Sequence, residues 1–139
     1  MKVLIDTNIA LDFLLIRNPF YASSVAILAM ADKELITCYI SASAITDIFY
    51  LSQKKLGKNP AKEALKKLLQ VFKPAAVTAS HIYEALDLEW EDFEDSVQYV
   101  VGENFPVNYV VTRNINDYAS GSIPAVTPEQ FIQVIATDA

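Results

Sequence analysis

The fold is decided by the stretch KVLIDTNIALD, residues 2–12. Its first apolar residues, Val3 to Ile5, predict a short buried strand that ends abruptly on the carboxylate of Asp6. Thr7 or Asn8 can then cap a helix. The apolar side of this helix carries Leu11, Phe13, Leu14 and Leu15. The stretch therefore predicts a buried strand followed directly by a helix.

The junction between this strand and helix is a place where chemistry is expected. Open α/β sheets bind their ligands at the carboxyl ends of the strands, where Asp6 stands. Asp12 follows about a turn and a half into the helix. The alternative is structural, with Asp6 acting only as a helix cap and Asp12 solvated. This stretch alone leaves both interpretations open, so the question is whether other acids converge on Asp6.

Short apolar runs alternate with amphipathic helices along the rest of the chain. We expect further strands at 35–40, 75–77 and 107–111, and a short edge strand that ends at Val126. We expect helices at 19–31, from Ser41 or Ser43 to 56, 60–72, from Thr78 or Ser80 onward, 90–104 and from Thr127 onward. No linker or internal repeat interrupts the pattern. It predicts a single α/β domain, residues 1–139, with a mainly parallel sheet.

The composition excludes several classes of protein. The chain of 139 residues has one cysteine, Cys38, and one histidine, His81, which excludes an internal disulfide and a Cys/His zinc cluster. No apolar run approaches the roughly 18 residues of a membrane helix. The first apolar run stops at Asp6 and is too short for a signal peptide. We therefore expect a cytoplasmic protein that does not enter a membrane.

The charges are separated along the chain. The formal net charge is −6, yet residues 54–73 hold seven of the eleven bases and one acid, whereas residues 84–95 hold seven of the seventeen acids. A basic segment and an acidic cluster would suit a metal-dependent enzyme that acts on a phosphate polymer. The alternative is that the lysines only decorate the exposed face of a surface helix. Both interpretations remain open.

Several acids stand where a parallel sheet could bring them together. Asp6 ends the first strand, Asp47 lies in the helix after the second, and Asp117 lies just beyond the fourth. Asp92 and Asp95, three residues apart, share one face of a helix. Carboxylates so gathered would repel one another, whereas Mg²⁺ and Mn²⁺ prefer oxygen ligands. The acids therefore predict a Mg²⁺ or Mn²⁺ site that could activate a water for attack on a phosphodiester.

The order of these motifs resembles that of the PIN-domain family. The motifs are Asp6-Thr7-Asn8, the helix that holds Asp47, the segment Asp92-Phe93-Glu94-Asp95-Ser96, and residues 111–118, VTRNINDY. The tail at residues 126–131 also resembles the usual ending of the family. The resemblance implies a three-layer α/β/α sandwich with a mainly parallel sheet. It also implies a magnesium- or manganese-dependent ribonuclease, often the VapC-type toxin of a toxin–antitoxin pair and commonly a homodimer.

The resemblance also implies roles for individual residues. Asp6, Asp95 and Asp117 resemble the metal-binding and catalytic acids, and Asp47 occupies a position usually held by glutamate. Asn8 resembles the partner that orients the first aspartate. Thr112 and Asn114 resemble hydrogen-bonding residues around the last strand of the site.

RNA would dock on the basic residues. Arg113 could touch a phosphate or could equally point away from the site. The lysines that would guide the substrate electrostatically are Lys54, Lys55, Lys58, Lys62 and Lys66.

Two of the acids carry open alternatives. Asp47 keeps the charge of glutamate but is one methylene shorter, so it could reach a metal directly or only through a water. Asp92 is either an additional metal ligand or the N-cap of a helix that contains Asp95.

The function also has an alternative. A PIN-like module that binds a protein or nucleic acid with weak or no catalysis would explain both Asp47 and the net acidity. Other aspartate enzymes with parallel sheets fit less well. A phosphohydrolase of the haloacid-dehalogenase type would need an aspartate where this chain has Asn8, and a receiver domain would need one near Val77-Thr78.

Overall fold

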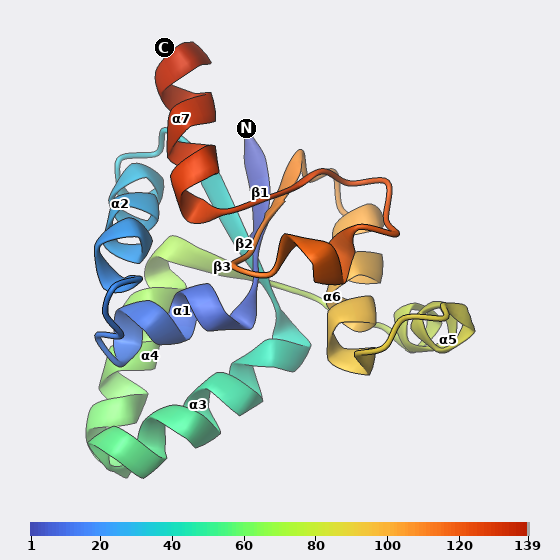
Figure 1. The fold of residues 1–139 in the computed structure, drawn as a ribbon. Coiled ribbons are helices and arrows are strands. Elements are labelled where there is room, and N and C mark those ends of the chain that lie inside the picture. The colour runs from blue at the N-terminus through green and yellow to red at the C-terminus, as the bar shows by residue number, and fades with distance from the viewer. Residues whose placement is uncertain (139) are drawn as a thin grey trace.

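A five-stranded, all-parallel sheet forms the centre of the computed structural model, which describes residues 1–138 (Figure 1). The strands stand in the order β3-β2-β1-β4-β5. Their bounds are Lys2–Ile5 for β1, Thr37–Ser41 for β2, Phe72–Ala75 for β3, Tyr109–Val111 for β4 and Ala125–Val126 for β5. Because β1 lies in the middle of the sheet, its carboxyl end is flanked by those of β2 and β4.

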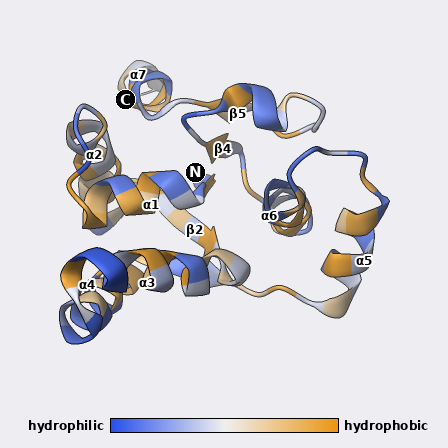
Figure 2. Ribbon diagram, turned by 60° about the horizontal axis from the view of Figure 1, so that its bottom comes forward, coloured by the Kyte–Doolittle hydropathy of each residue, from blue (hydrophilic) through white to orange (hydrophobic). Residues whose placement is uncertain are grey.

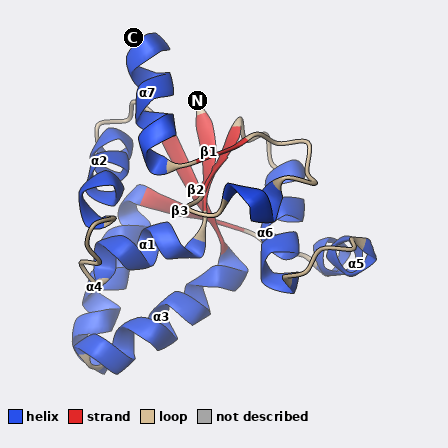
Figure 3. Cartoon of the chain, viewed as in Figure 1, coloured by secondary structure: helices blue, strands red, loops and turns tan. Residues whose placement is uncertain are grey.

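Helices cover both faces of the sheet (Figures 2 and 3). The bounds are Thr7–Leu14 for α1, Tyr21–Asp32 for α2, Ala42–Leu56 for α3, Lys58–Val71 for α4, Ala79–Asp87 for α5, Phe93–Glu103 for α6 and Pro128–Asp138 for α7, with a 3₁₀ helix, η1, at Ile115–Tyr118. One core packs α1, α2, α3, α4 and α7 against the sheet, and the other packs α5, α6 and η1. The chain is thus a three-layer α/β/α sandwich, which confirms the predicted fold class.

The alternation of side chains in β1 explains why both cores meet at this strand. Val3 and Ile5 are fully buried in the first core, whereas Leu4 is buried in the second. Successive residues of a strand point to opposite faces, so an uninterrupted apolar run fits a strand that is covered on both sides. The same central position carries the next residue, Asp6, to the edge where the carboxyl ends meet.

Several element boundaries differ from the sequence prediction. The third strand is Phe72–Ala75 and not 75–77, because α4 ends at Val71 and Phe72 already pairs with Cys38 of β2. Phe72 is buried in the first core, and this tertiary packing outweighs its place in a helical pattern. The helix predicted from residue 90 begins at Phe93.

The helix α4 exposes its lysines, as the sequence predicted. The ribbon of α4, which carries four of the lysines, is largely hydrophilic in Figure 2. Across residues 1–138, no helix is both long enough and apolar enough to span a membrane.

Candidate active site

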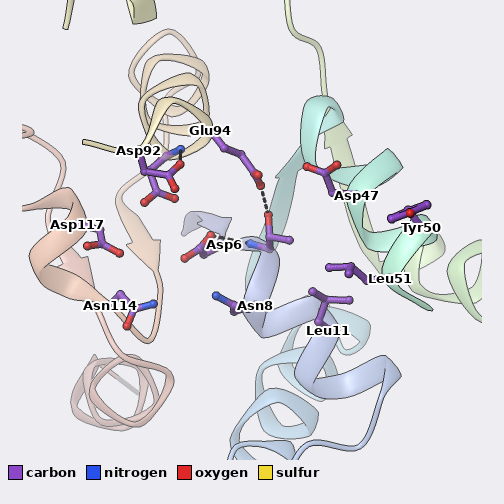
Figure 4. Close-up of a pocket in the computed structure, with 12 residues that line it drawn as sticks. Asp6, Asn8, Leu11, Asp47, Tyr50, Leu51, Asp92, Glu94, Asn114 and Asp117 are labelled. Atoms are coloured by element: carbon purple, nitrogen blue, oxygen red, sulfur yellow. Dashed lines mark hydrogen bonds between the residues drawn. The ribbon is translucent and has the colours of Figure 1, made fainter. Parts of the chain in front are cut away.

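A pocket of about 450 Å³ opens at the carboxyl edge of the sheet (Figure 4). Its walls come from α1, α3, α6 and the segment after β4, which are far apart in sequence. Six carboxylates and two amides line it, together with a threonine and three larger apolar or aromatic side chains. The lining residues are Asp6, Asp47, Asp92, Glu94, Asp95, Asp117, Asn8, Asn114, Thr7, Leu11, Tyr50 and Leu51.

Asp6 is the most buried acid of the pocket, at 5% exposure. It is the N-cap of α1, and its Oδ1 accepts a hydrogen bond of 2.7 Å from the Thr7 backbone N–H. Its Oδ2 accepts a second bond of 2.7 Å from the Thr112 hydroxyl. Burial raises the pKa of Asp6, and these hydrogen bonds oppose the rise. Asp6 is therefore both a cap and a pocket acid, which answers the question that the sequence left open.

Asp92 and Asp95 stand together at the start of α6. Asp92 is the N-cap, since its Oδ1 accepts a bond of 2.9 Å from the Asp95 backbone N–H, and it also lines the pocket. The Tyr118 hydroxyl donates to Asp95 Oδ1 over 3.3 Å. Burial, followed by the negative charges of Asp6, Asp92 and Asp117, raises the pKa of Asp95 to about 7. These carboxylates thus already repel one another at neutral pH.

Glu94 belongs to the pocket although the sequence reasoning passed over it. Its Oε1 accepts a bond of 3.0 Å from the Thr7 hydroxyl. Burial raises the pKa of Glu94, and the nearby acids Asp47 and Asp92 raise it further. One available signal was the spacing between Glu94 and Gln98, four residues apart on one helix face. The density of acids in residues 84–95 hid this signal.

Two buried polar residues lie beneath the acids and were also missed. Gln98 is fully buried, and its Nε2 lies 3.4 Å from Thr7 Oγ1 and 3.5 Å from Glu94 Oε1. Tyr118 is 1% exposed, and burial together with the neighbouring aspartates raises the pKa of its hydroxyl, which keeps it a hydrogen-bond donor. Both residues carry polar groups under the carboxylates. Nothing in the local sequence distinguishes them from ordinary helix residues.

The residues predicted to orient the site are only partly used in that way. Thr112 is fully buried and donates to Asp6, and its hydroxyl also accepts a bond of 3.0 Å from the Asn114 backbone N–H. Asn8 and Asn114 line the pocket. In the described part of the chain, however, Asn8 makes no hydrogen bond to Asp6, and Thr7 and Thr112 hold that carboxylate instead.

Arg113 points away from the pocket, which decides between the two alternatives left open for it. Its Nε lies 2.9 Å from Oδ2 of Asp12, and its guanidinium lies 3.9 Å from the ring centroid of Phe20. Asp12 is fully buried, and Arg17 Nη1 lies 3.8 Å from its Oδ1. Burial raises the pKa of Asp12, and the charges of Arg113 and Arg17 offset part of that rise. This buried ion pair ties α1 to the segment after β4.

The predicted substrate-binding lysines lie on the last turn of α3 and along α4. All are exposed, and none lines the pocket: Lys54, Lys55, Lys58, Lys62 and Lys66. Lys54 Nζ lies 4.4 Å from the ring centroid of Tyr50, a residue of the pocket. Lys55 donates to the Leu15 carbonyl over 3.5 Å, and Lys66 pairs with Glu63 over 3.5 Å.

The donor set of the pocket fits a hard divalent cation. Carboxylate and amide oxygens are the preferred ligands of Mg²⁺ and Mn²⁺, and no histidine or cysteine lines the pocket to favour a softer metal. Among residues 1–138, no three His, Cys, Asp or Glu side chains form a ready coordination group. Mg²⁺ usually keeps several waters and uses few protein ligands, so the acids fit such an ion without all of them touching it.

Comparison with protein families supports the order of motifs read from the sequence. A family model described as the PIN domain matches residues 2–116. This span contains every acid that lines the pocket except Asp117, which directly follows its last residue. No curated protein matches the chain.

Comparison with solved structures gives the same fold at low sequence identity. VapC20 of Mycobacterium tuberculosis, described as a sarcin-ricin loop cleaving toxin, has a TM-score of 0.67 at 14% identity, over 86% of this chain and 95% of that one. VapBC2 of Rickettsia felis, bound to a fragment of promoter DNA, has a TM-score of 0.70 at 15% identity, over 91% and 98%. A toxin–antitoxin complex from Klebsiella pneumoniae has a TM-score of 0.68 at 20% identity, over 91% and 97%.

Proposed function

The chain belongs to the PIN-domain family, and from this premise we propose that it is a metal-dependent endoribonuclease. The observation that carries the proposal is the convergence of six carboxylates in one pocket at the carboxyl edge of a parallel sheet. The similar VapC20 of Mycobacterium tuberculosis is a toxin that cleaves the sarcin-ricin loop, which supports RNA as the substrate. The proposed reaction is hydrolysis of an RNA phosphodiester bond.

Asp6, Asp95 and Asp117 would hold Mg²⁺ or Mn²⁺, with Asp47 and Asp92 as further ligands, direct or through water. When bound, such an ion supplies Lewis acidity, which lowers the pKa of a water and offsets charge on the phosphate. Thr7 and Thr112 fix the direction of the Asp6 carboxylate through two hydrogen bonds. The Tyr118 hydroxyl does the same for Asp95. The ligand wall is thus oriented before an ion arrives.

Glu94 would take part as a proton carrier. It is half-buried, and burial, followed by the charges of the neighbouring acids, raises the pKa of Glu94 and so favours its protonated form. A carboxyl group whose pKa is raised above its ordinary value is suited to give up or take a proton near the reacting phosphate. Its Oε1 is positioned by the Thr7 hydroxyl and lies near the Gln98 amide.

Neutralising single acids tests the proposal. Asp6→Asn and Asp117→Asn are each expected to lower the rate of RNA cleavage in manganese buffer by at least about 100-fold, since each removes a charged ligand and leaves a similar shape. Asp32→Asn, at the exposed end of α2, is the matched control and should cleave normally. Circular dichroism melts verify that the variants are folded. Equal cleavage by wild type and both site variants contradicts the proposal.

The proposal extends to the biological role: the chain would act as a toxin, bind an antitoxin protein and form a homodimer. The similar structures include proteins described as a VapBC pair and a toxin–antitoxin complex, which supports a partner protein. An RNA substrate is consistent with action in the cytoplasm. Expression of the wild-type chain should arrest bacterial growth, and Asp6→Asn should not. Light scattering of the purified protein tests the dimer directly.

The second candidate function is an interaction module without catalysis. It is favoured by Asp47, which is shorter than the glutamate usual at that position, and by the lack of a ready coordination group within residues 1–138. Titration calorimetry with Mn²⁺ separates the two functions. Binding that is lost in Asp6→Asn supports the nuclease, whereas no binding at millimolar metal by the folded protein supports the module.

A further inference from the structure

One face of α3 carries a row of side chains that extends outward from the acid pocket. Asp47, Tyr50, Leu51 and Lys54 follow one another at positions i, i+3, i+4 and i+7, which places them on the same side of the helix. We call these four residues the α3 face. The first three line the pocket, together with Leu11 of α1. In Figure 4, Tyr50 and Leu51 lie on the opposite side of Asp6 from Asp117 and Asn114.

The pocket therefore has two chemically different ends. Most of the acids gather at one end, whereas the other end combines Asp47 with the apolar and aromatic side chains of Leu51 and Tyr50. Tyr50 is 54% exposed and Leu51 39% exposed, although both are large apolar side chains. Leu11 is buried and forms the floor of this end. An exposed aromatic and an exposed leucine beside charged groups do not serve the core, so their place at the pocket calls for a ligand with an apolar face.

The ammonium group of Lys54 at Tyr50 indicates which class of ligand would bind here. Lys54 Nζ lies over one face of the Tyr50 ring, 4.4 Å from its centroid, so a positive charge is held at this aromatic side chain. Lys55 and Lys58, which follow closely in the sequence, are exposed as well. A flat π-face with cations along one side is the combination that binds single-stranded nucleic acids, because bases stack on the ring and phosphates meet the cations.

We propose that the α3 face is a subsite for an unpaired nucleobase of RNA. The base stacks on the face of Tyr50 opposite Lys54, beside Leu51, and the adjoining phosphate meets Lys54, while a neighbouring phosphate lies at the acids. This inference rests on the proposed function, because the same RNA strand would occupy both ends of the pocket. Bases in a duplex are stacked on one another and do not present a free face. The subsite therefore selects single-stranded segments and loops.

Steady-state kinetics with a short single-stranded RNA tests the subsite. Tyr50→Ala is expected to raise KM by roughly 5- to 100-fold with little change in kcat, which corresponds to the loss of one base–aromatic stack. Tyr50→Phe keeps the ring and should restore KM to near the wild-type value. Tyr83→Ala is the matched control, since Tyr83 lies on α5 outside the pocket and is 69% exposed. The same RNA annealed to its complement should be cleaved poorly by the wild type.

Photocrosslinking provides a readout that does not need cleavage. The wild-type chain is irradiated with the same RNA carrying 4-thiouridine, in the absence of divalent ions, and the modified residue is located by mass spectrometry. We expect the crosslink on α3 at or beside Tyr50. A crosslink there in a protein that cleaves no RNA would support the subsite while contradicting the proposed nuclease.

Two results would overturn the subsite. The first is an active wild type whose KM is unchanged in Tyr50→Ala. The second is an inactive wild type whose crosslinks lie away from α3. In either case, loss of binding to a protein partner on substitution of Tyr50 would assign the α3 face to that protein instead.

Discussion

Asp6 is held by donors from opposite ends of the chain. The Thr7 N–H comes from the next residue, whereas the Thr112 hydroxyl comes from the end of β4, 106 residues away. A buried carboxylate that accepts hydrogen bonds from neutral donors keeps its direction without losing its charge to an ion pair. It therefore stays available to a cation that enters the pocket.

Repulsion between Asp95 and the other acids should lower the thermal stability of the metal-free protein. The pKa of Asp95, about 7 in the folded chain, is above the ordinary value of 3.8, so the penalty on stability is small at pH 4 and below, grows as the pH rises from about 4 to 7, and stays at its full size above pH 7. Asp95→Asn is expected to raise Tm at pH 8 in EDTA and to leave Tm at pH 4 unchanged. Since the carboxylate is only half-buried and solvent screens it, we expect a gain of roughly 2–4 °C.

This measurement has two controls, the addition of Mn²⁺ and the substitution of an acid remote from the pocket. Saturating Mn²⁺ should stabilise the wild type more than Asp95→Asn and so remove or reverse the difference in Tm. Asp32→Asn, at an exposed acid away from the pocket, should give the wild-type pH profile. A lower Tm of Asp95→Asn in EDTA at pH 8 would contradict repulsion as the dominant effect on this residue.

The candidate site could be predicted where its residues follow the ends of strands. Asp6 and Asp117 were identified because the carboxyl ends of parallel strands meet, and both line the pocket. Gln98 and Tyr118 could not be predicted, because their role depends on how α6 and η1 pack beneath the acids. The direction of Arg113 is likewise set by its buried partner Asp12, which is distant in sequence. The catalytic roles remain predictions until the variants are measured.

At the scale of the elements, the end of α1 carries a strained residue. Ile16 has a φ of 51°, in the left-handed region that a β-branched side chain rarely adopts. Its backbone N–H bonds to the Phe13 carbonyl, and the Arg17 N–H bonds over 3.0 Å to the Asp12 carbonyl, which is the pattern of a Schellman motif. Glycine is the usual residue at this position. Ile16 is 61% exposed, so core packing does not explain it.

Ile16→Gly is therefore expected to stabilise the protein by about 1 kcal/mol, because relief of the left-handed strain exceeds the extra chain entropy of glycine. Chemical denaturation gives the free energy of unfolding. Gly57→Ala is the matched control in the opposite direction: Gly57 has a φ of 90° between α3 and α4, and an alanine there should cost about 1–3 kcal/mol. Destabilisation by Ile16→Gly would mean that its side chain contributes packing that outweighs the strain.

Element types were predicted better than element boundaries. The apolar runs at residues 3–5 and 107–111 contain true strands, but β4 begins only at Tyr109. The helix predicted from 19 starts at Tyr21, where Phe20 precedes it without a side-chain cap. Boundaries of this kind depend on which residues the neighbouring elements bury. The hydrophobic period of one segment does not contain that information.

For the whole molecule, the separation of charge should appear in the salt dependence of RNA binding. Replacing Lys58, Lys62 and Lys66 of α4 by Gln is expected to weaken binding of single-stranded RNA and to reduce the slope of log K against log salt by up to about 2. Fluorescence anisotropy at several salt concentrations measures both quantities. Binding should remain single-strand specific, because these lysines contact phosphate rather than base.

A second set of three lysines provides the control. Lys2 begins β1, Lys33 precedes β2 and Lys73 lies in β3, so all three stand away from the carboxyl edge of the sheet. Replacing them by Gln changes the net charge equally. Equal loss of affinity in the two triple variants would show that overall charge, and not α4, guides the RNA.

The fold class of the whole molecule could be predicted because its pattern repeats. Apolar strands alternate with amphipathic helices, and such an order has few solutions besides a parallel sheet covered on both faces. The strand order β3-β2-β1-β4-β5 could not be predicted from this alternation, because it depends on which helices cross over which face of the sheet. We propose that residues 1–139 form one domain, because both cores share β1.

The buried pair of Arg113 and Asp12 has a mechanical consequence. Asp6 and Asp12 sit at the cap and in the body of one helix, while Thr112 and Arg113 are adjacent residues after β4. Thr112 donates a hydrogen bond of 2.7 Å to Asp6, and Arg113 pairs with Asp12 over 2.9 Å. Two separate contacts prevent α1 from rotating against the segment after β4, so this wall of the pocket is stiff. Any adjustment to a ligand must come from the opposite wall, where Asp47 projects from α3.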